Sequence, residues 1–370
     1  MKKILFSFSL LILFSFIVSA QKIEKPKLTA QPPTAAQEML IREGMGLVDQ
    51  RKYDDAIIKI EQVLKESPDC AAAMYELALA YYNKGGQARA DELARKGAQY
   101  KSEYLPLFYT VIGNVLDDNG KSLEAIEVYK NSVKLLRENK KATRNLAEAE
   151  FNLGVAYARQ KQFVESRAAL KEGLEANFSH VSSHFVLAQI YSGTGYKIPG
   201  FLAAARFLGL EKNTQRTQLA AQTILTMLKP ASKDEKTGNI NIFINMNAPK
   251  DEGDFGFMEL ILGTVTTVRG DDDKNKTDNE MFVDGVGTVI AILSENKDLR
   301  KTFVGKKYVP YMEALKNAGH QQAFAYVVLQ QGGNKDAEKW LSANQEKVLA
   351  YFNWASSYQP PNSLVNRQSN

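Results

Sequence analysis

The sequence predicts a mainly α-helical chain in which about five helix-turn-helix units are stacked into a solenoid. Two observations predict this fold. Small residues recur in near-identical settings at Gly44, Ala78, Gly113, Gly154 and Ala188, with spacings of 34, 35, 41 and 34 residues. Around each of them, apolar residues recur at three- and four-residue intervals, the pattern of a helix that buries one face. A period of this length is typical of chains that repeat one supersecondary unit.

The chain begins with the layout of a secretory signal peptide. Lys2 and Lys3 precede an apolar run from residue 4 to residue 18, and small residues follow up to Ala20. The run is shorter than the roughly 20 residues that span a membrane. We therefore expect cleavage near Ala20 and Gln21, export to the periplasm or secretion, and no transmembrane segment afterwards. An uncleaved anchor is the alternative.

Residues 21–36 are rich in proline and lysine and predict a flexible leader. The repeats follow it. In the fourth unit, Leu153, Gly154 and Tyr157 match the L-G-x2-Y of a first helix in the tetratricopeptide repeat, a family with a period of 34 residues. The chain resembles this family over residues 37–214, although Glu43 and Glu150 depart from its pattern. The resemblance implies a right-handed solenoid in which glycine and alanine let paired helices approach closely.

The resemblance also implies a concave groove, lined by the first helices of successive repeats, that receives an extended or helical peptide. Aromatic side chains there supply contact area, and amides can pair with a peptide backbone. The alternative is that the same residues fill a closed superhelix. Ile41 and Tyr75 stand where some members carry lysines for a terminal carboxylate, so we do not expect a charged chain terminus as ligand. The groove-facing residues in this register are Tyr75, Leu79, Tyr82, Asn83, Thr110, Asn114, Asp117, Phe151, Arg159, Phe185 and Gln189.

Beyond residue 214 the repeat period is lost. Residues 215–230 predict one helix that caps the solenoid, and the polar stretch 231–238 predicts a linker. We expect a mostly helical C-terminal domain over residues 239–358, with one short strand near Ile240 where apolar residues alternate. Residues 359–370 predict a disordered tail. The helices expected in this domain are Phe255–Val268, Asn279–Ser294, Tyr311–Ala318, Gln321–Gln331 and Asp336–Tyr358.

Composition excludes several classes of protein. The formal net charge is +5, and it falls to +3 when Lys2 and Lys3 leave with the signal peptide. Basic and acidic residues alternate and form no basic block, so nucleic-acid binding is not expected. The single cysteine, Cys70, excludes an intramolecular disulfide.

Short motifs add no cofactor, metal or catalytic residue. Gly120, Lys121 and Ser122 resemble the end of a phosphate-binding loop, but they fall on the turn inside the third repeat. His180 and His184 lie four residues apart, which is half of a zinc site, and lack the adjacent glutamate of the metalloprotease motif. Six acidic or amide residues near a possible calcium loop fit no EF-hand register. They are Asp271, Asp272, Asp273, Asn275, Asp278 and Glu280.

Three functions remain open. The first is an exported scaffold that holds a protein or peptide partner in the repeat groove. The second is an enzyme whose C-terminal domain is catalytic, for which Asp251, Glu252, Asp254 and Glu259 are the available acids. The third is a structural component that self-associates through apolar faces at residues 214–228 or 279–294. Repeat solenoids present extended binding surfaces, so the first is favoured, and no enzymatic activity is predicted.

Overall fold

The computed structural model describes residues 25–139, 142–229, 232–233, 237, 240–241, 250–265 and 275–361. The chain forms two compact units, residues 1–131 and 132–370, and the limit between them falls within helix α6. The predicted signal peptide and the acidic residues at 271–273 lie outside the described residues. Almost every described element is a helix, so the predicted mainly α-helical repeat fold is confirmed.

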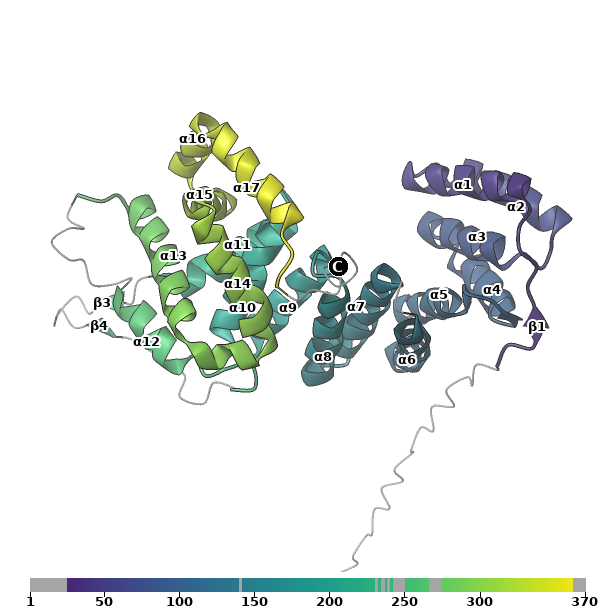
Figure 1. The fold of residues 1–370 in the computed structure, drawn as a ribbon, viewed down its shortest axis with the longest axis horizontal. Coiled ribbons are helices and arrows are strands. Elements are labelled where there is room, and N and C mark those ends of the chain that lie inside the picture. Colours follow the sequence, from purple (N-terminus) through teal and green to yellow (C-terminus); the bar gives the residue numbers. More distant parts are fainter. Residues whose placement is uncertain are drawn as a thin grey trace, which may run out of the picture. The chain divides into compact units, whose positions relative to one another are not determined.

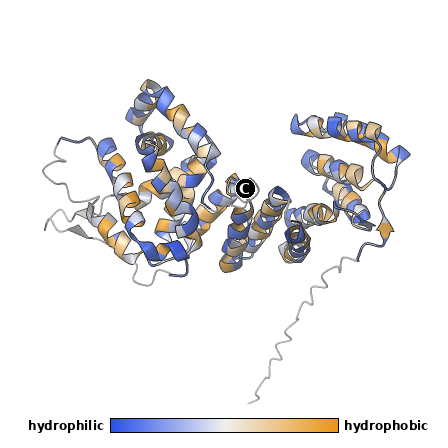
Figure 2. Cartoon of the chain, in the orientation of Figure 1, coloured by the Kyte–Doolittle hydropathy of each residue, from blue (hydrophilic) through white to orange (hydrophobic). Residues whose placement is uncertain are grey.

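The first unit consists of successive antiparallel helices, drawn in purple to blue in Figure 1. Each helix carries hydrophobic residues together with hydrophilic ones, as expected for helices that bury one face (Figure 2). α1 packs against α2, and α3 packs against both α2 and α4. The elements are β1 Leu28–Thr29, α1 Ala35–Asp49, α2 Tyr53–Glu66, α3 Ala71–Lys84, α4 Gln87–Gly97, β2 Tyr100–Lys101, α5 Leu105–Asp118 and α6 Ser122–Glu138.

The small residues of the repeat pattern lie where paired helices cross. A Cβ added to Gly44 would stand 2.5 Å from the side chain of Ile60 on the facing helix. Ala78, at the same place in the second repeat, is fully buried. Since real Cβ atoms do not approach other atoms so closely, a larger residue at position 44 would push α1 and α2 apart. The spacing of the small residues in the sequence therefore reflects the spacing of the points where paired helices cross.

The leader has fixed partners over part of its length. β1 pairs in parallel with β2, and the backbone N–H groups of Lys27 and Leu28 donate to the Gln99 carbonyl at 3.0 Å. The N–H of Gln31 donates to the Asp69 carbonyl. These contacts lie at the loops that connect one repeat to the next. The flexible leader expected over residues 21–36 is therefore held against the first unit from residue 27 to residue 31.

The second unit begins with the last residues of α6 and contains the other repeats and the C-terminal helices, drawn in teal to yellow in Figure 1. α7 pairs with α8, and α9 pairs with α10, as the repeat pattern predicts. The elements are α7 Thr143–Arg159, α8 Phe163–Ala176, α9 Val181–Gly193, α10 Lys197–Leu208, α11 Gln215–Met227, β3 Ser232–Lys233, β4 Ile240–Asn241, α12 Gly256–Val265, α13 Asp278–Glu295, the 3-10 helix η2 Lys297–Lys301, α14 Phe303–Asn317, α15 Gln321–Gln331, α16 Lys335–Ala343 and α17 Gln345–Ser357.

One hydrophobic core runs through the second unit, from Leu170 on α8 to Ala355 on α17. α10 packs against α14, and α11 packs against α15, so helices of the predicted C-terminal domain cover the predicted capping helix. Most of the predicted linker at 231–238 lies outside the described residues. The domain limits at 231–238 stay a prediction, and the helices on their two sides share this core.

Several expected helix limits differ from the observed ones. The helix expected over Tyr311–Ala318 begins at Phe303, because Thr302 caps it and Pro310 is accommodated inside it. The helix expected over Asp336–Tyr358 is two helices, α16 and α17, separated at Asn344. The expected strand is present as β4, which pairs with β3 in an antiparallel register. The tail is described as far as residue 361 and the rest lies outside the described residues.

Candidate functional site

The first helices of the first three repeats pack as neighbours. α1 contacts α3, and α3 contacts α5, so their outward sides form one surface, the α1–α3–α5 face (Figure 1). On α3 this face is a stripe of residues three or four positions apart, which lie on one side of a helix. Tyr75, Leu79 and Tyr82 are half-buried there and Asn83 is exposed. These four were predicted from the repeat register, and the structure brings them together.

Aromatic rings gather at the start of this face. The ring of Tyr75 lies 5.7 Å from the ring of Tyr104 and 6.0 Å from the ring of Phe108, centroid to centroid. Tyr104 precedes α5, and burial raises the pKa of its hydroxyl. Tyr104 was not among the predicted residues, because it lies before the helix on which the repeat register places groove residues. The rings offer a large contact area with polar tips.

The other end of the face joins α3 to α5. The Tyr82 hydroxyl donates to the Asp118 carboxylate at 2.6 Å, and the Gln87 side-chain amide donates to the same oxygen at 3.3 Å. Asp118 is exposed. It ends α5 and is a functional candidate that the sequence reasoning missed, although it stands next to the predicted Asp117.

The predicted residues of α5 form hydrogen bonds within the first unit. Asn114 accepts a hydrogen bond from the Tyr129 hydroxyl at 2.8 Å, and Thr110 donates to the Pro106 carbonyl at 3.2 Å. Asp117 is buried and accepts from the Ser122 hydroxyl at 2.5 Å, which ties the end of α5 to the start of α6. Asp117 therefore acts in the helix turn, while Thr110 and Asn114 keep half-exposed side chains on the face.

Glu76 is the most perturbed acid on the α1–α3–α5 face. It is half-buried beside Tyr75, and burial together with the nearby Asp49 carboxylate of α1 raises its pKa to about 7. Burial and a like charge both disfavour the ionised form of a carboxyl group. Glu76 was not singled out from the sequence, because Asp49 approaches it from a different helix and no spacing reports that approach.

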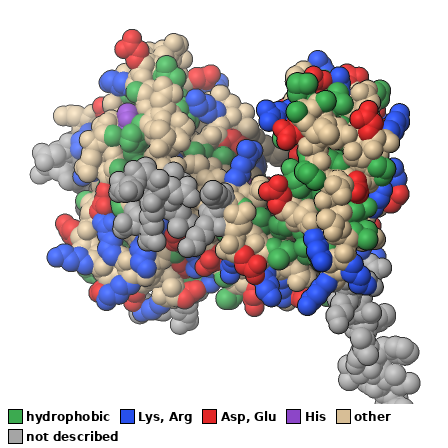
Figure 3. Space-filling model, turned by 45° about the vertical axis from the view of Figure 1, so that its right-hand side comes forward, with side chains coloured by type: hydrophobic (Ala, Val, Ile, Leu, Met, Phe, Trp, Pro, Cys, Tyr) green, Lys and Arg blue, Asp and Glu red, His purple; other side chains and the backbone are tan. Residues whose placement is uncertain are grey.

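Two of the three helices of this face carry a net negative charge. α5 carries two aspartates and no basic residue, and α1 carries three acids against Arg42 alone. On the side of the molecule drawn in Figure 3, Lys, Arg, Asp and Glu are interspersed with hydrophobic side chains. That side has no basic face of the kind that nucleic-acid binding requires.

The predicted groove residues of the second unit differ in their surroundings. The Phe151 ring lies 5.1 Å from the ring of His180. Phe185 packs 5.1 Å from Phe207, and the Arg216 guanidinium lies 5.5 Å from the Phe185 ring centre. Both aromatic rings are therefore covered in part by side chains of the chain itself. Arg159 and Gln189 are exposed.

His180 sits between a serine and a glutamate. Its Nδ1 lies 2.8 Å from the Ser183 hydroxyl, and its Nε2 lies 3.1 Å from the Glu148 carboxylate. Three such groups resemble the partners of a nucleophilic serine. Ser183 is fully buried, however, so no substrate can reach its hydroxyl, and the arrangement serves the start of α9.

The histidine pair does not form a metal site. His184 is fully buried, with Nδ1 2.8 Å from the Tyr308 hydroxyl and Nε2 2.8 Å from the Phe178 carbonyl. Both ring nitrogens have partners in the core, and burial lowers the pKa of this imidazole. Within the described ranges, no group of three His, Cys, Asp or Glu could hold a metal ion. Gly120, at a φ of +77°, lies in the turn between α5 and α6, as predicted.

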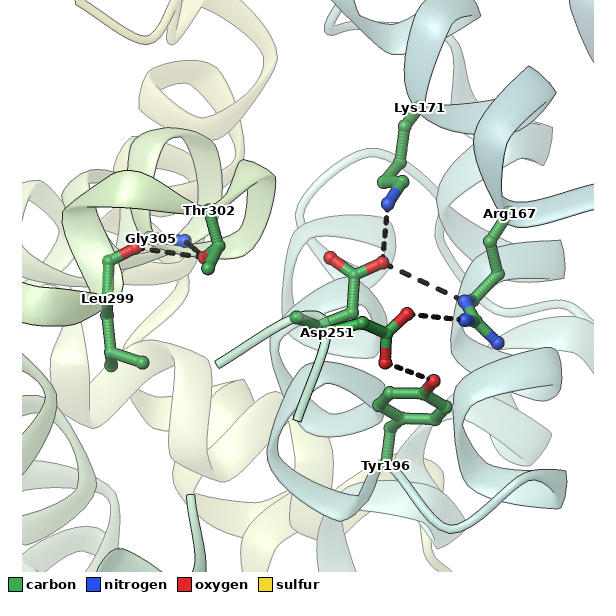
Figure 4. A network of polar contacts seen from close by, with 8 residues as sticks. Arg167, Lys171, Tyr196, Asp251, Leu299, Thr302 and Gly305 are labelled. Carbon is green, nitrogen blue, oxygen red and sulfur yellow. Dashed lines mark hydrogen bonds and ion pairs between the residues drawn. The ribbon is translucent and has the colours of Figure 1, made fainter. Parts of the chain in front are cut away.

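The acids proposed for a catalytic C-terminal domain have structural partners (Figure 4). Arg167 on α8 donates to Asp251 at 2.8 Å, and Lys171 donates to the buried Glu252 at 2.5 Å. The Tyr196 hydroxyl also donates to Asp251. This network joins the loop before α12 to the fourth repeat. Asp254 pairs with Lys250 and Glu259 with Lys197, so each acid is engaged by a cation.

Comparison with known proteins identifies the repeats. A sequence family described as the tetratricopeptide repeat matches residues 41–99 and 110–180. The first range contains Gly44, whose close approach to Ile60 is described above. Residues 41–99 and 110–180 belong to the tetratricopeptide-repeat family. In this family's register, α1 to α8 form four repeats, and α9 and α10 form the fifth pair, which begins where the matched range ends.

Several solved structures share the tetratricopeptide-repeat (TPR) fold with this chain. PilF from Pseudomonas aeruginosa is 17% identical with a TM-score of 0.46, over 52% of this chain and 83% of that chain. PilW, described as a widely conserved type IV pilus biogenesis factor, is 14% identical with a TM-score of 0.46, over 73% and 99%. YrrB, described as a TPR protein with an unusual peptide-binding site, is 15% identical with a TM-score of 0.37, over 50% and 90%. No curated protein sequence matches the chain.

In the part of the chain that the structure describes, none of the helices combines the length and the apolar character needed to cross a membrane.

Proposed function

We propose that this TPR protein is an exported adaptor that holds a segment of a partner protein on the α1–α3–α5 face. The observation that carries the proposal is the stripe of Tyr75, Leu79 and Tyr82, half-buried beside the exposed Asn83. Aromatic residues with a polar tip are enriched among the residues that dominate binding energy at interfaces. Repeat proteins use the extended surfaces of successive helices in this way.

The first unit is preferred over the second for this role. Tyr75, Leu79 and Tyr82 share one helix, whereas the aromatic candidates of the second unit, Phe151 and Phe185, lie on different helices. The acids Asp251 and Glu252 are held in an ion network with Arg167 and Lys171. A binding role for the repeats is therefore favoured over a catalytic role for the C-terminal helices.

Export is supported by the sequence alone. Lys2, Lys3, the apolar run and the small residues up to Ala20 have the layout of a signal peptide. We place the mature chain in the periplasm or outside the cell. The test is fractionation of the source cells, with the mass of the purified chain showing whether it begins at Gln21. A chain recovered from the cytoplasm with its first 20 residues would contradict export.

Position-specific photo-crosslinking tests the binding face. A photoreactive amino acid replaces Leu79 or Asn83 on the face, or Ile58 on α2 as the control, in the full chain expressed in its native cell envelope. Ile58 is 61% exposed and lies on a second helix of the first repeat. We expect the same covalent adduct from positions 79 and 83 and none from position 58. Equal adducts from all three positions, or an adduct from position 58 alone, would contradict the proposal.

A pair of variants checks the same conclusion without a photoreactive group. Leu79→Ser together with Asn83→Ala removes apolar contact and an amide from the face, while Ile58→Ser removes an apolar side chain elsewhere. A stronger version changes Tyr75, Tyr82 and Asn114 to alanine. Each variant is first shown by circular dichroism to keep its helix content. Capture of the crosslinked partner is expected to fail for the face variants and to persist for Ile58→Ser.

A further inference from the structure

The α1–α3–α5 face places aromatic rings and carboxylates side by side. We infer that the partner segment it holds presents a lysine or arginine side chain to Glu76, against the rings of Tyr75 and Tyr104. The inference rests on the proposed function and adds the chemistry of the partner to it. It concerns the first unit only.

The rings supply the first reason. Tyr75 and Tyr104 are 5.7 Å apart with an angle of 41° between their planes, and Phe108 meets Tyr75 edge-on. The face of an aromatic ring attracts a cation, and the alkyl chain of lysine or arginine packs on the same surface. An acidic segment would gain neither contact. Aromatic rings next to a carboxylate therefore favour a cationic occupant.

The carboxylates supply the second reason. Glu76 on α3 lies near Asp49 at the end of α1. The negative charges of Glu76 and Glu38 both contribute to raising the pKa of the Tyr104 hydroxyl. Glu38 is paired with Arg42 at 3.5 Å. For Glu76 and Asp49, the described residues provide no lysine or arginine within ion-pair distance. Two carboxylates near each other give a negative potential that a partner's cation would neutralise.

The raised pKa of Glu76 supports this inference. Burial and the Asp49 charge bring that pKa to about 7, so the ionised form is held at a cost to the folded chain. An incoming cation would lower the cost, because an opposite charge nearby favours ionisation. The ionised form of Glu76 thus destabilises the folded chain, and a basic ligand would stabilise it.

A second carboxylate, Asp118, lies near the other end of α3. Asp118 contacts Tyr82, which follows Glu76 by six positions on α3, or about 9 Å along the helix axis. An extended peptide covers about the same distance in three residues. We therefore expect a second basic side chain within a few residues of the first, directed to Asp118, with an apolar residue between them to contact Leu79.

The experiment uses a displayed library of capped ten-residue peptides with no free termini. Peptides are selected for binding to three separate targets: the chain lacking residues 1–20, the same chain with Glu76→Gln, and the same chain with Asp55→Asn. Asp55 is an exposed acid on α2, so its substitution makes the same change of net charge away from the face. Bound peptides are sequenced, and their affinities are measured by fluorescence anisotropy.

The expected result is enrichment of lysine and arginine over aspartate and glutamate. Glu76→Gln is expected to weaken the selected peptides by on the order of tenfold, and Asp55→Asn by less than about twofold. Enrichment of acidic or neutral peptides, or equal binding by Glu76→Gln, would overturn the cation assignment and leave the binding face standing. The affinities of the same peptides for Leu79→Ser are also measured. If Leu79→Ser binds every selected peptide as tightly as the native chain does, the proposed function fails as well.

Discussion

The ring of Tyr129 on α6 lies directly over Gly113 on α5, where an added Cβ would stand 2.4 Å from the ring. The Tyr129 hydroxyl then donates to the Asn114 side chain at 2.8 Å. α5 therefore contacts α6 in two ways at adjacent residues. Gly113 leaves room for the Tyr129 ring, and Asn114 accepts a hydrogen bond from the Tyr129 hydroxyl. Because Asn114 also lies on the α1–α3–α5 face, the packing of this repeat positions part of the candidate site.

The first prediction follows from that contact. Gly113→Ala forces the Tyr129 ring to move, and overpacking of this kind costs about 1 to 3 kcal/mol. Gly46→Ala is the control, since a Cβ there meets nothing within 4 Å. Alanine is favoured over glycine inside a helix by roughly 0.5 to 1 kcal/mol, so Gly46→Ala is expected to stabilise the chain. Urea unfolding followed by circular dichroism measures both. A neutral Gly113→Ala would show that α6 is free to shift.

Much of the repeat region could be predicted because its contacts are local. Gly44, Gly113 and Gly154 mark crossings between consecutive helices, and such crossings leave a regular spacing in the sequence. The limits of α15 were predicted as observed for the same reason. The break between α16 and α17 was missed because apolar residues continue across it. There the Asn344 amide donates to the Trp340 carbonyl and ends the first helix.

The candidate site was predicted only in part. Tyr75, Leu79 and Tyr82 follow from the helix period, but Asp49 reaches Glu76 from a different helix, and no spacing reports that approach. The same limit applies to Arg167, which meets Asp251 from 84 residues away. A pattern within one helix cannot show which charged residues of distant segments lie next to each other in the fold.

The second prediction concerns the buried network beside α8. Glu252 is 1% exposed and lies between Lys171 and Arg167. Glu252→Gln removes the negative charge and leaves both cations without it, so the second unit is expected to lose about 3 kcal/mol. Asp254→Asn, which breaks the exposed pair with Lys250, is the control and should change stability little. Thermal unfolding compares the two. Equal effects would mean that the network does not hold the loop to α8.

The third prediction is a pH dependence centred on Glu76. Its pKa is about 7 in the folded chain against an ordinary value of 4.5, so the folded state binds more protons than the unfolded state between these values. This group's contribution to stability is therefore greatest below pH 4.5 and is lost as the pH rises through 7. The groups that face it are Asp49 on α1 and Tyr104 before α5.

Glu76→Gln turns that dependence into a measurement. The variant keeps the neutral form at every pH, so it should stabilise the chain by roughly 1 to 2 kcal/mol at pH 8, allowing for partial exposure, and by little at pH 5. Unfolding midpoints at the two pH values test it, with Asp55→Asn as the control that shows no such difference. A variant that is more stable at pH 8 and also binds basic peptides less well would identify Glu76 as a residue kept for binding at a cost to stability.

The last prediction concerns Arg206, whose guanidinium is fully buried on α10. It donates to the Ala355 carbonyl at 2.5 Å and to the Tyr358 carbonyl at 3.3 Å, at the end of α17. Carbonyls at a helix C-terminus carry partial negative charge, so this contact fixes α17 to the repeats. Arg206→Met is expected to cost about 1.5 to 3 kcal/mol and to expose α17 to limited proteolysis. Lys212→Met, which removes an ammonium 4.0 Å from the Phe352 ring centre, is the control and should leave cleavage unchanged. If both variants are cleaved at the same rate as the native chain, α17 is held by the core contacts of its own buried Tyr351 and Ala355 and not by Arg206.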